Sequence, residues 1–315
     1  MRATPSSLAQ LFVLACILFS AAATPSRAAE PAHEEIDPDV LRKVRKLIQG
    51  TLSTEEADRE KAWNQIKDMG NLAVPGLIGL YRQKTTTAEE VGSILIALGD
   101  SKDPRAGPAL VELLGSPEPS VRRDTARAIG DINYKDGAPA LLKIARDEKE
   151  NEDVRLFTAT AAAKLGSDDA FAVLTALLKS QHPEVRSRAV FAIGKFGGVK
   201  HVGQIEVALA DSDDSVREDA VEALHLLKKE ETYPGLIKAT ADENYKIRNA
   251  AMDALRDGTG EKIENNPQAW KDWWTAQAEK KNKKNEKKDD TKLKIKKGAP
   301  EDDAAPPKGP KGKED

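Results

Sequence analysis

The stretch Ser120-Val121-Arg122-Arg123-Asp124-Thr125-Ala126-Arg127-Ala128-Ile129-Gly130 decides the fold, because its pattern recurs along the chain. Its Val-Arg pair returns as Val154-Arg155, Val185-Arg186, Val216-Arg217 and Ile247-Arg248. The steps between successive pairs are 33, 31, 31 and 31 residues. A period of this length is typical of a solenoid, in which each unit buries its apolar face against its neighbours.

The residues after each Val-Arg pair follow the spacing of an α-helix. When the first residue of the pair is position zero, positions four, five and eight are small or apolar in every copy, as in Thr125, Ala126 and Ile129. These positions form one stripe on a helix of 3.6 residues per turn. Position seven is always alanine: Ala128, Ala161, Ala192, Ala223 and Ala254. This column of small residues predicts that two helices cross closely there.

A second kind of helix precedes each of these. Pro108, Pro139 and Pro234 each open an apolar run, at a place where the first helical turn needs no N–H donor. Polar or proline-containing breaks such as residues 115–117 separate the two helices. Two more copies align upstream, with position zero at Glu90 and at Asp58. We therefore predict an all-α fold with about seven two-helix repeats over residues 53–260.

The repeated pattern resembles a known family. Val-Arg at the head of the helix, Ala at position four or five and Ala-Ile-Gly at its end are similar to HEAT-like repeats of the short bacterial type named after phycobilisome lyases. The resemblance covers about two thirds of the chain. It implies a right-handed α-solenoid, with the second helices on its concave face. It does not imply lyase activity, because most relatives simply bind other proteins.

The first 29 residues have the pattern of a secretory signal peptide. Arg2 precedes an apolar run from Leu8 to Ala23, and small residues follow. An uncleaved anchor and lipidation at Cys16 are the alternatives. Cys16 is the only cysteine, so a chain cleaved after it cannot be stabilised by disulfides. We expect a periplasmic or secreted protein, with no membrane span in the mature chain if the signal is cleaved.

Two segments flank the repeats at their ends. Residues 30–52 are expected to form a linker and a short helix. Residues 261–279 contain Trp270, Trp273 and Trp274, which at this spacing share one face of a helix. We interpret this face as a cap on the last repeat; the alternative is an aromatic docking face. Residues 259–274 also resemble an ending found in other secreted bacterial HEAT-like proteins.

The C-terminal segment, residues 280–315, differs from the rest in charge. It carries 13 lysines and 8 acidic residues, a net charge of +5, whereas residues 30–279 carry 34 basic and 44 acidic residues, a net charge of −10. With few large apolar residues it is expected to be disordered. A basic tail can contact a polyanionic surface; the simpler interpretation is a solvated tail. Nucleic acid is not expected as a partner, because the signal peptide directs the chain out of the cell.

The sequence offers no set of catalytic or metal-binding residues. Its histidines are His33, His182, His201 and His225, without ligand spacing between them. HEAT-like repeats include an iron enzyme, deoxyhypusine hydroxylase, with several His-Glu pairs, but here the one such pair, His33-Glu34, lies outside the repeats. The acidic turn at residues 211–214 lacks the glycine and distant glutamate of an EF-hand. We predict no enzymatic activity, no cofactor and no metal.

An arginine stands near the head of nearly every second helix. The column reads Arg59, Arg122, Arg155, Arg186, Arg217 and Arg248. We interpret it as structural: ion pairs between repeats, or hydrogen bonds to carbonyl groups of the turns. The nearby acids expected to take part are Asp124, Asp153, Glu184, Asp214 and Asp219. The alternative is that the column binds an acidic partner.

The candidate partner-binding residues are those that break the repeat pattern. Positions two, three and six are expected to point away from the core and are mostly charged or small, yet they hold Leu156, Phe157 and Phe191. The basic residues beside them are Arg123, Arg127 and Arg188. Protein interfaces concentrate aromatic residues and arginine. Equally, the phenylalanines can simply fill the space between repeats.

The function predicted from these observations is a non-enzymatic protein–protein interaction scaffold or adaptor in the bacterial cell envelope. Its partner, another protein, is expected on the concave face. One alternative is an envelope tether whose basic tail binds a polyanionic surface. The other is an accessory subunit of a lyase-type enzyme.

Overall fold

The computed structural model describes residues 36–83 and 85–297. Within them every regular element is an α-helix or a short 3-10 helix, which confirms the predicted all-α fold. The expected signal peptide with Cys16, the residue His33, and residues 298–315 of the expected tail lie outside the described residues.

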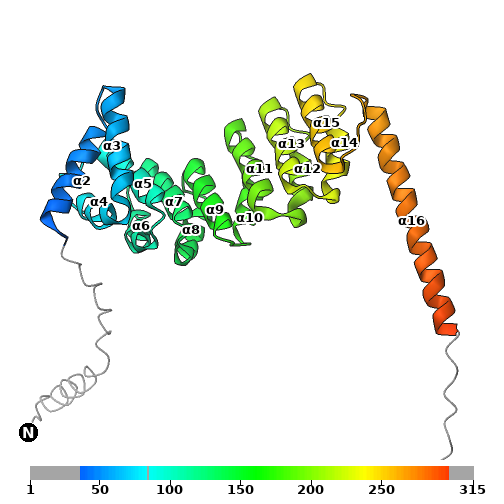
Figure 1. The fold of residues 1–315 in the computed structure, drawn as a ribbon, viewed down its shortest axis with the longest axis horizontal. Helices are drawn as coiled ribbons and strands as arrows, with labels where there is room; N and C mark the ends of the chain where they lie inside the picture. Colours follow the sequence, from blue (N-terminus) through cyan, green and yellow to red (C-terminus); the bar gives the residue numbers. More distant parts are fainter. Residues whose placement is uncertain (1–35, 84, 298–315) are drawn as a thin grey trace, which may run out of the picture. The chain divides into compact units, whose positions relative to one another are not determined.

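The α-helices of the described chain follow one another as seven pairs, as the repeat pattern predicts (Figure 1). The pairs are α2 (Pro38–Gly50) with α3 (Glu56–Met69), α4 (Ala73–Tyr81) with α5 (Ala88–Ser101), α6 (Gly107–Leu113) with α7 (Pro119–Asp131), α8 (Ala138–Ala145) with α9 (Glu152–Lys164), α10 (Ala170–Leu177) with α11 (Pro183–Gly197), α12 (Val202–Ala208) with α13 (Asp214–Leu227), and α14 (Tyr233–Ala239) with α15 (Tyr245–Thr259). A single long helix, α16 (Pro267–Lys297), follows the last pair.

The chain divides into two compact units, and the boundary falls after Ala109. The first unit contains α2 to α5. There α2 packs against α4 and α4 against α5, around side chains such as Ile48, Leu77 and Leu98, which are fully buried. Thr87 starts α5 with a capping box, in which its side chain accepts from the Glu90 amide and the Glu90 carboxylate accepts from the Thr87 amide.

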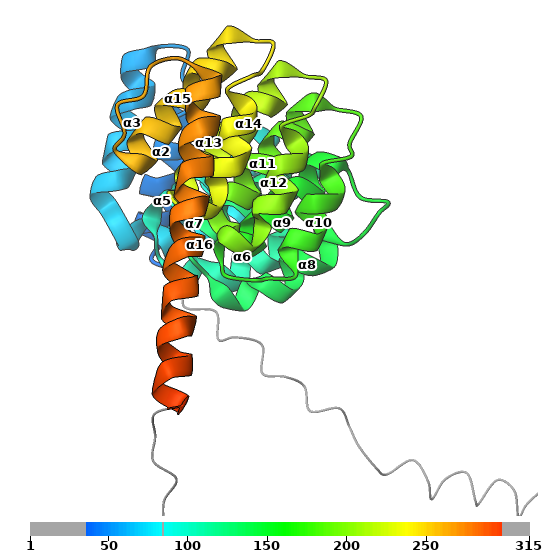
Figure 2. The same cartoon turned by 90° about the vertical axis from the view of Figure 1, so that its right-hand side faces the viewer.

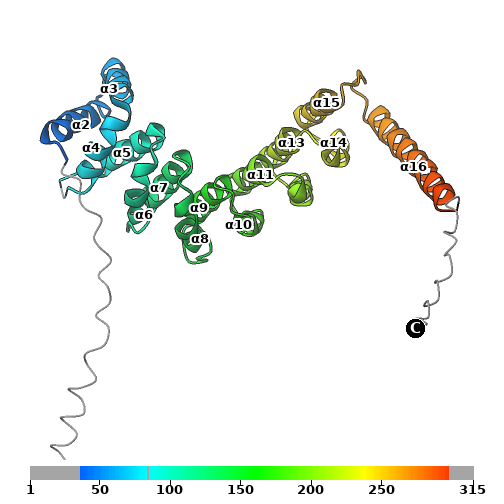
Figure 3. The same cartoon turned by 60° about the horizontal axis from the view of Figure 1, so that its bottom comes forward.

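The second unit begins within α6 and contains the five closely similar repeats. Its second helices α7, α9, α11, α13 and α15 lie side by side in one row. The first helices α8, α10 and α14 lie along one side of that row (Figure 3). Proline in the first turn of α8 and α14, at Pro139 and Pro234, agrees with the helix starts expected from the sequence. The Asn151 side chain caps α9 by accepting from the amides of Asp153 and Val154.

The close crossing predicted at position seven is confirmed between consecutive second helices. A Cβ atom added at Gly194 of α11 would lie 2.4 Å from the Cβ and 2.7 Å from the Cα of Ala223 in α13. One added at Gly130 of α7 would lie 3.4 Å from the Cβ of Ala161 in α9. The alanine at position seven therefore packs onto position nine of the preceding second helix, where glycine permits the approach.

Replacing Gly194 by alanine is expected to push α11 and α13 apart. The new methyl group meets backbone atoms of Ala223, which cannot move away independently, so overpacking costs about 1–3 kcal/mol. Gly130→Ala is the matched control: its methyl group makes an ordinary contact, and alanine in place of a helical glycine gains about 1 kcal/mol. Urea unfolding of both variants checks the prediction, and equal changes for the two would contradict it.

The arginine column is structural, as interpreted from the sequence. In Arg59, Arg122, Arg186, Arg217 and Arg248, Nη1 donates to the backbone carbonyl six residues earlier, at 2.7–2.9 Å. Arg155 instead donates from Nε to the Ala145 carbonyl at 3.1 Å. Each arginine thus satisfies a carbonyl group at the end of the preceding first helix or in the turn after it.

Three arginines of the column also pair with an acid of the next repeat. The closest nitrogen–oxygen distances are 2.7 Å for Arg122–Glu150, 2.7 Å for Arg186–Asp211 and 2.9 Å for Arg217–Asp242. The prediction from the sequence therefore named the wrong acids for most of these ion pairs. Of those five, Asp214 contacts a column arginine, 2.6 Å from Arg217, whereas Asp124 pairs with Arg123 and Arg127 instead. The acids used by all three pairs lie 25–28 residues further along, in the turn that stacking brings alongside.

The Arg186–Asp211 pair is expected to make stability depend on pH. Hydrogen bonds from Arg186 hold the pKa of Asp211 below its ordinary value. A carboxyl group with a lowered pKa in the folded state stabilises the protein above its unfolded pKa, and this contribution is lost as the pH falls through the folded value. Arg186→Met should therefore lower the free energy of unfolding by about 2 kcal/mol at pH 7. The loss should be smaller at about pH 2, where the hydrogen bond to the Ser180 carbonyl still counts but the ion pair does not.

The matched control for this prediction is Arg188→Met, on the same helix. Arg188 is exposed and has no acidic partner among the described side chains, so its loss should change stability little at either pH. Urea unfolding of the two variants at both pH values makes the comparison. A destabilisation by Arg186→Met that is the same at both pH values would show that the ion pair does not contribute as stated.

The last helix is longer than expected. Residues 261–279 were expected to contain a helix and residues 280–315 to be disordered, but α16 continues to Lys297. No glycine or proline lies between Gln268 and Lys297, and lysine, glutamate and alanine are good helix formers. The low apolar content of this segment led to the expectation of disorder, although its residues have a high helix propensity. The C-terminal part of α16 extends away from α14 and α15 (Figures 1 and 2).

The tryptophans of α16 pack against α14. Trp270 is fully buried, and the rings of Trp273 and Trp274 lie 6.1 and 6.0 Å from the ring of Tyr233. The Tyr233 hydroxyl donates to the Gly258 carbonyl at 2.8 Å. The aromatic residues of α16 are therefore joined to the last helix pair.

Candidate partner-binding groove

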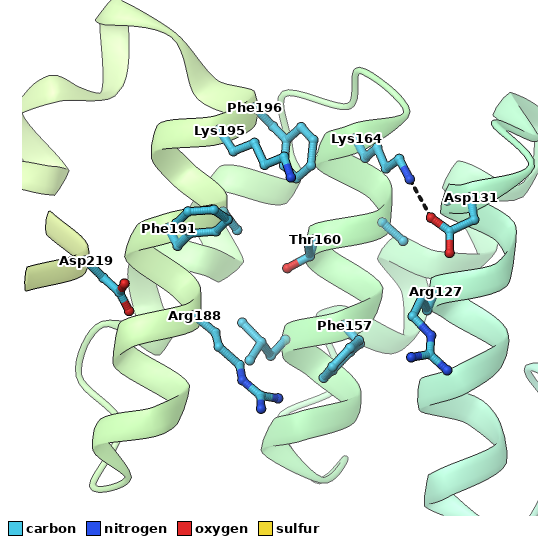
Figure 4. A pocket seen from close by; sticks show the side chains of 14 residues that line it. Arg127, Asp131, Phe157, Thr160, Lys164, Arg188, Phe191, Lys195, Phe196 and Asp219 are labelled. Carbon is cyan, nitrogen blue, oxygen red and sulfur yellow. Dashed lines mark hydrogen bonds and ion pairs between the residues drawn. The ribbon is translucent and has the colours of Figure 1, made fainter. Parts of the chain in front are cut away.

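A groove of about 490 Å³ opens on the row of second helices (Figure 4). Helices α7, α9 and α11 form most of it, and α13 contributes one residue. Its lining consists of Arg127, Gly130, Asp131, Leu156, Phe157, Thr160, Ala161, Lys164, Arg188, Phe191, Ala192, Lys195, Phe196 and Asp219. All of these belong to the second unit.

The groove exists because its floor is made of small residues. Ala161 and Ala192 occupy position seven, and Gly130 occupies position nine, so the helices approach closely and leave a hollow between the longer side chains around it. Phe157, Phe191 and Phe196 form the apolar walls and remain half-buried. The phenylalanine rings are therefore not fully buried in the core.

Basic side chains stand over these rings. The guanidinium carbons of Arg188 and Arg123 lie 5.7 and 5.9 Å from the ring centre of Phe157. Lys195 Nζ lies 5.5 Å from the ring centre of Phe191 and 5.7 Å from that of Phe196. Each of these cation–π contacts is worth about 0.5–1 kcal/mol at an exposed site. The contacts hold positive charge directly beside the apolar walls.

The acids around the groove are already engaged. Asp131 binds Lys164 Nζ at 2.6 Å, and Asp124 lies 3.2 and 3.5 Å from the guanidinium groups of Arg123 and Arg127. Asp219 accepts a hydrogen bond from the Ser187 hydroxyl. Arg188 and Lys195, in contrast, have no acidic partner among the side chains that the structure describes.

The structure brings the six residues predicted from the sequence together. Leu156, Phe157, Arg188, Phe191 and Arg127 line the groove, and Arg123 reaches it through its contact with Phe157. One detail was wrong: Leu156 was expected to point away from the core, but it is 2% exposed. Position two lies at the edge of the packed stripe, since Arg123 and Ser187 in the same column are half-buried.

Two lysines and a third phenylalanine of the groove were not among the residues predicted from the sequence. Lys164 and Lys195 occupy position ten, and Phe196 occupies position eleven. Position ten lies one helical turn after position six, on the same face. Extending the comparison of columns by one turn finds both lysines.

The described histidines do not form a site. His201 stacks on Phe171 with ring centres 4.2 Å apart, and burial lowers its pKa. His225 lies 2.9 Å from Asp257, while His182 is exposed. Among the described side chains, no group of three or more His, Cys, Asp or Glu residues is arranged to hold a metal ion.

The acidic turn at residues 211–214 stabilises the fold. Asp211 pairs with Arg186, and the Asp213 carboxylate caps α13 by accepting from the Ser215 amide.

None of the described helices is both long and apolar enough to span a membrane.

The family model of HEAT repeats matches four overlapping stretches, residues 91–152, 107–192, 148–204 and 173–256. Together they cover more than half of the chain and include all the helices that form the groove. Among proteins with curated descriptions, none matches this chain.

Several solved structures are similar at low sequence identity. The complex of CpcE and CpcF of phycocyanin lyase from Nostoc is 18% identical, with a TM-score of 0.43 over 70% of this chain and 90% of that chain. A karyopherin bound to a SUMO protease is 14% identical, with a TM-score of 0.49 over 68% and 28%. Human deoxyhypusine hydroxylase is 18% identical, with a TM-score of 0.31 over 71% and 98%. Similarities this distant do not indicate what this chain binds.

Proposed function

Because the chain belongs to the HEAT-repeat family, we propose that it is a non-enzymatic scaffold or adaptor that binds a partner protein in the groove of α7, α9 and α11. The observation that supports this proposal is the groove itself. It combines three half-buried phenylalanines with two exposed basic side chains, Arg188 and Lys195, that have no acidic partner among the described side chains. Binding energy at protein interfaces concentrates in such aromatic and arginine residues.

In the proposed scaffold, different positions of the repeat have different roles. Positions seven and nine bring the helices together, and the arginine column fixes the turns. Positions three, six and ten then carry side chains that are free to differ from repeat to repeat. Among the members of these columns, we assign Phe157, Arg188, Phe191 and Lys195 to partner binding.

We further propose that the protein acts in the bacterial cell envelope. The pattern of residues 1–29, a basic residue followed by an apolar run and small residues, supports this location. Fractionation of cells, followed by determination of the mature N-terminus, tests it. A product that keeps residue 1 and stays in the cytoplasm would contradict the proposed location.

The aromatic face of α16 is proposed to cap the row of repeats. The terminal repeat of a solenoid needs a cover for its apolar end. The burial of Trp270 and the contacts of Trp273 and Trp274 with Tyr233 support this role.

A tether that uses the basic C-terminal segment is the second candidate, favoured by the charge of +5 on residues 280–315. A pull-down from envelope extract separates the two functions. The bait proteins are residues 30–315 and a form that ends at Glu279. The scaffold requires both forms to retain the same defined protein. Capture that needs residues 280–315 and disappears at high salt would identify a tether instead.

A further inference from the structure

We infer that the groove takes an acidic segment: one or two large apolar side chains with Asp or Glu next to them. This inference rests on the proposed function, because it specifies the chemistry of the partner that the groove binds. The apolar side chains would lie between Phe157, Phe191 and Phe196, while the carboxylates would bind Arg188 and Lys195.

The charge of the groove runs against that of the chain around it. Residues 30–279 carry a net charge of −10, yet five basic side chains stand in or beside the groove: Arg123, Arg127, Lys164, Arg188 and Lys195. The acids that line the groove or pair with these cations are Asp124, Asp131 and Asp219. A local excess of positive charge in an acidic protein attracts and orients an acidic ligand.

The pairing of these charges shows where the carboxylates should bind. Asp131 and Asp124 already engage Lys164, Arg123 and Arg127. Arg188 and Lys195 are the remaining cations, and both are exposed. A guanidinium group can hold a carboxylate through two parallel hydrogen bonds, so Arg188 is the stronger of the two anchors.

The distances explain why the ligand should be apolar and acidic at neighbouring positions. Arg188 lies 5.7 Å from the centre of the Phe157 ring, and Lys195 lies 5.5 Å from that of Phe191. A ligand side chain packed on either ring therefore places its next residue beside a cation. An apolar segment without acids would cover these cations without pairing them, at the cost of their desolvation.

The next helix in the row limits the direction of the segment. On α13, positions two, three and six are Glu218, Asp219 and Glu222, and Glu218 and Glu222 are exposed. A segment that continues from α11 over α13 meets these acids. Its acidic residues should therefore lie over α9 and α11, with basic or neutral residues over α13.

Selection from a random peptide library tests this inference. The full chain serves as bait, and peptides that also bind the Phe157→Ser/Phe191→Ser variant are removed. The expected peptides combine large apolar residues with adjacent Asp or Glu. Basic or uncharged apolar peptides that depend on the groove would overturn the inference and leave the proposed function standing. If no peptide depends on the groove, the proposed function fails with it.

Reversing the charge of the two anchors gives an independent test. Arg188 and Lys195 are exposed, so Arg188→Glu/Lys195→Glu should fold normally, which thermal unfolding checks. The variant should bind the best acidic peptide at least about 10-fold more weakly, as for a lost charge-assisted contact, and should select peptides rich in Lys and Arg. Unchanged affinity and unchanged selection would overturn the inference.

Discussion

Trp270→Ala is expected to lower the free energy of unfolding by about 4 kcal/mol, within the range for removing a large buried aromatic side chain. The side chain is fully buried, and its Nε1 has no hydrogen-bond partner in the structure. Its contribution is therefore apolar packing. Chemical denaturation followed by circular dichroism measures the change.

The location of the damage tests the capping role. In a row of repeats each unit is stabilised by its neighbours, so loss of the cap should first expose α14 and α15 to hydrogen exchange. Helices α7 and α9 should keep their protection until global unfolding. Trp273→Ala is the comparison variant. Because Trp273 is only half-buried, its replacement should lower the free energy of unfolding by less than Trp270→Ala does. A change below about 1 kcal/mol for Trp270→Ala, well under the usual cost of such a truncation, would exclude the cap.

The second large effect is expected on partner binding. Phe157→Ser/Phe191→Ser should weaken binding by at least about 100-fold, because central aromatic residues of an interface each contribute about 2 kcal/mol or more. Both rings are half-buried, so the free energy of unfolding should change much less than for Trp270→Ala. Titration of the purified partner, with a parallel unfolding curve, measures both quantities.

A matched control removes exposed apolar side chains outside the groove. Val199 and Val207 are 43% and 71% exposed and do not line it. Val199→Ser/Val207→Ser should bind the partner as the unchanged chain does. An equal loss of binding in both double variants would show that the groove has no special role.

The repeats were predictable because their packing depends on local columns. The alanine at position seven of each repeat, and the residues Gly130 and Gly194, are visible in the sequence. They determine how closely consecutive second helices pack. The acid partners of the arginines were not predictable in this way. Glu150 and Asp211 lie in the next repeat, and only the stacking of one repeat on another brings them to Arg122 and Arg186.

The sequence predicted only those groove residues that differ clearly from the other residues in their column of the repeat. Phe157 and Phe191 stand out because their columns are otherwise charged or small. Phe196 does not stand out, because Ile132 and Leu165 in its column are buried core residues. Its ring is large enough to reach the groove from a position that usually serves the core.

The length of the last helix was also not predicted, because amino-acid composition alone did not reveal that α16 continues to Lys297.

Photo-cross-linking tests most directly whether the partner binds in the groove. Benzoylphenylalanine replaces Phe191 in one form of the full chain and Val207, which lies outside the groove, in another. After irradiation in envelope extract, the Phe191 position should give a defined cross-linked protein and the Val207 position should not. Cross-linking of the same protein at Val207 with none at Phe191 would place the partner elsewhere and contradict the assignment.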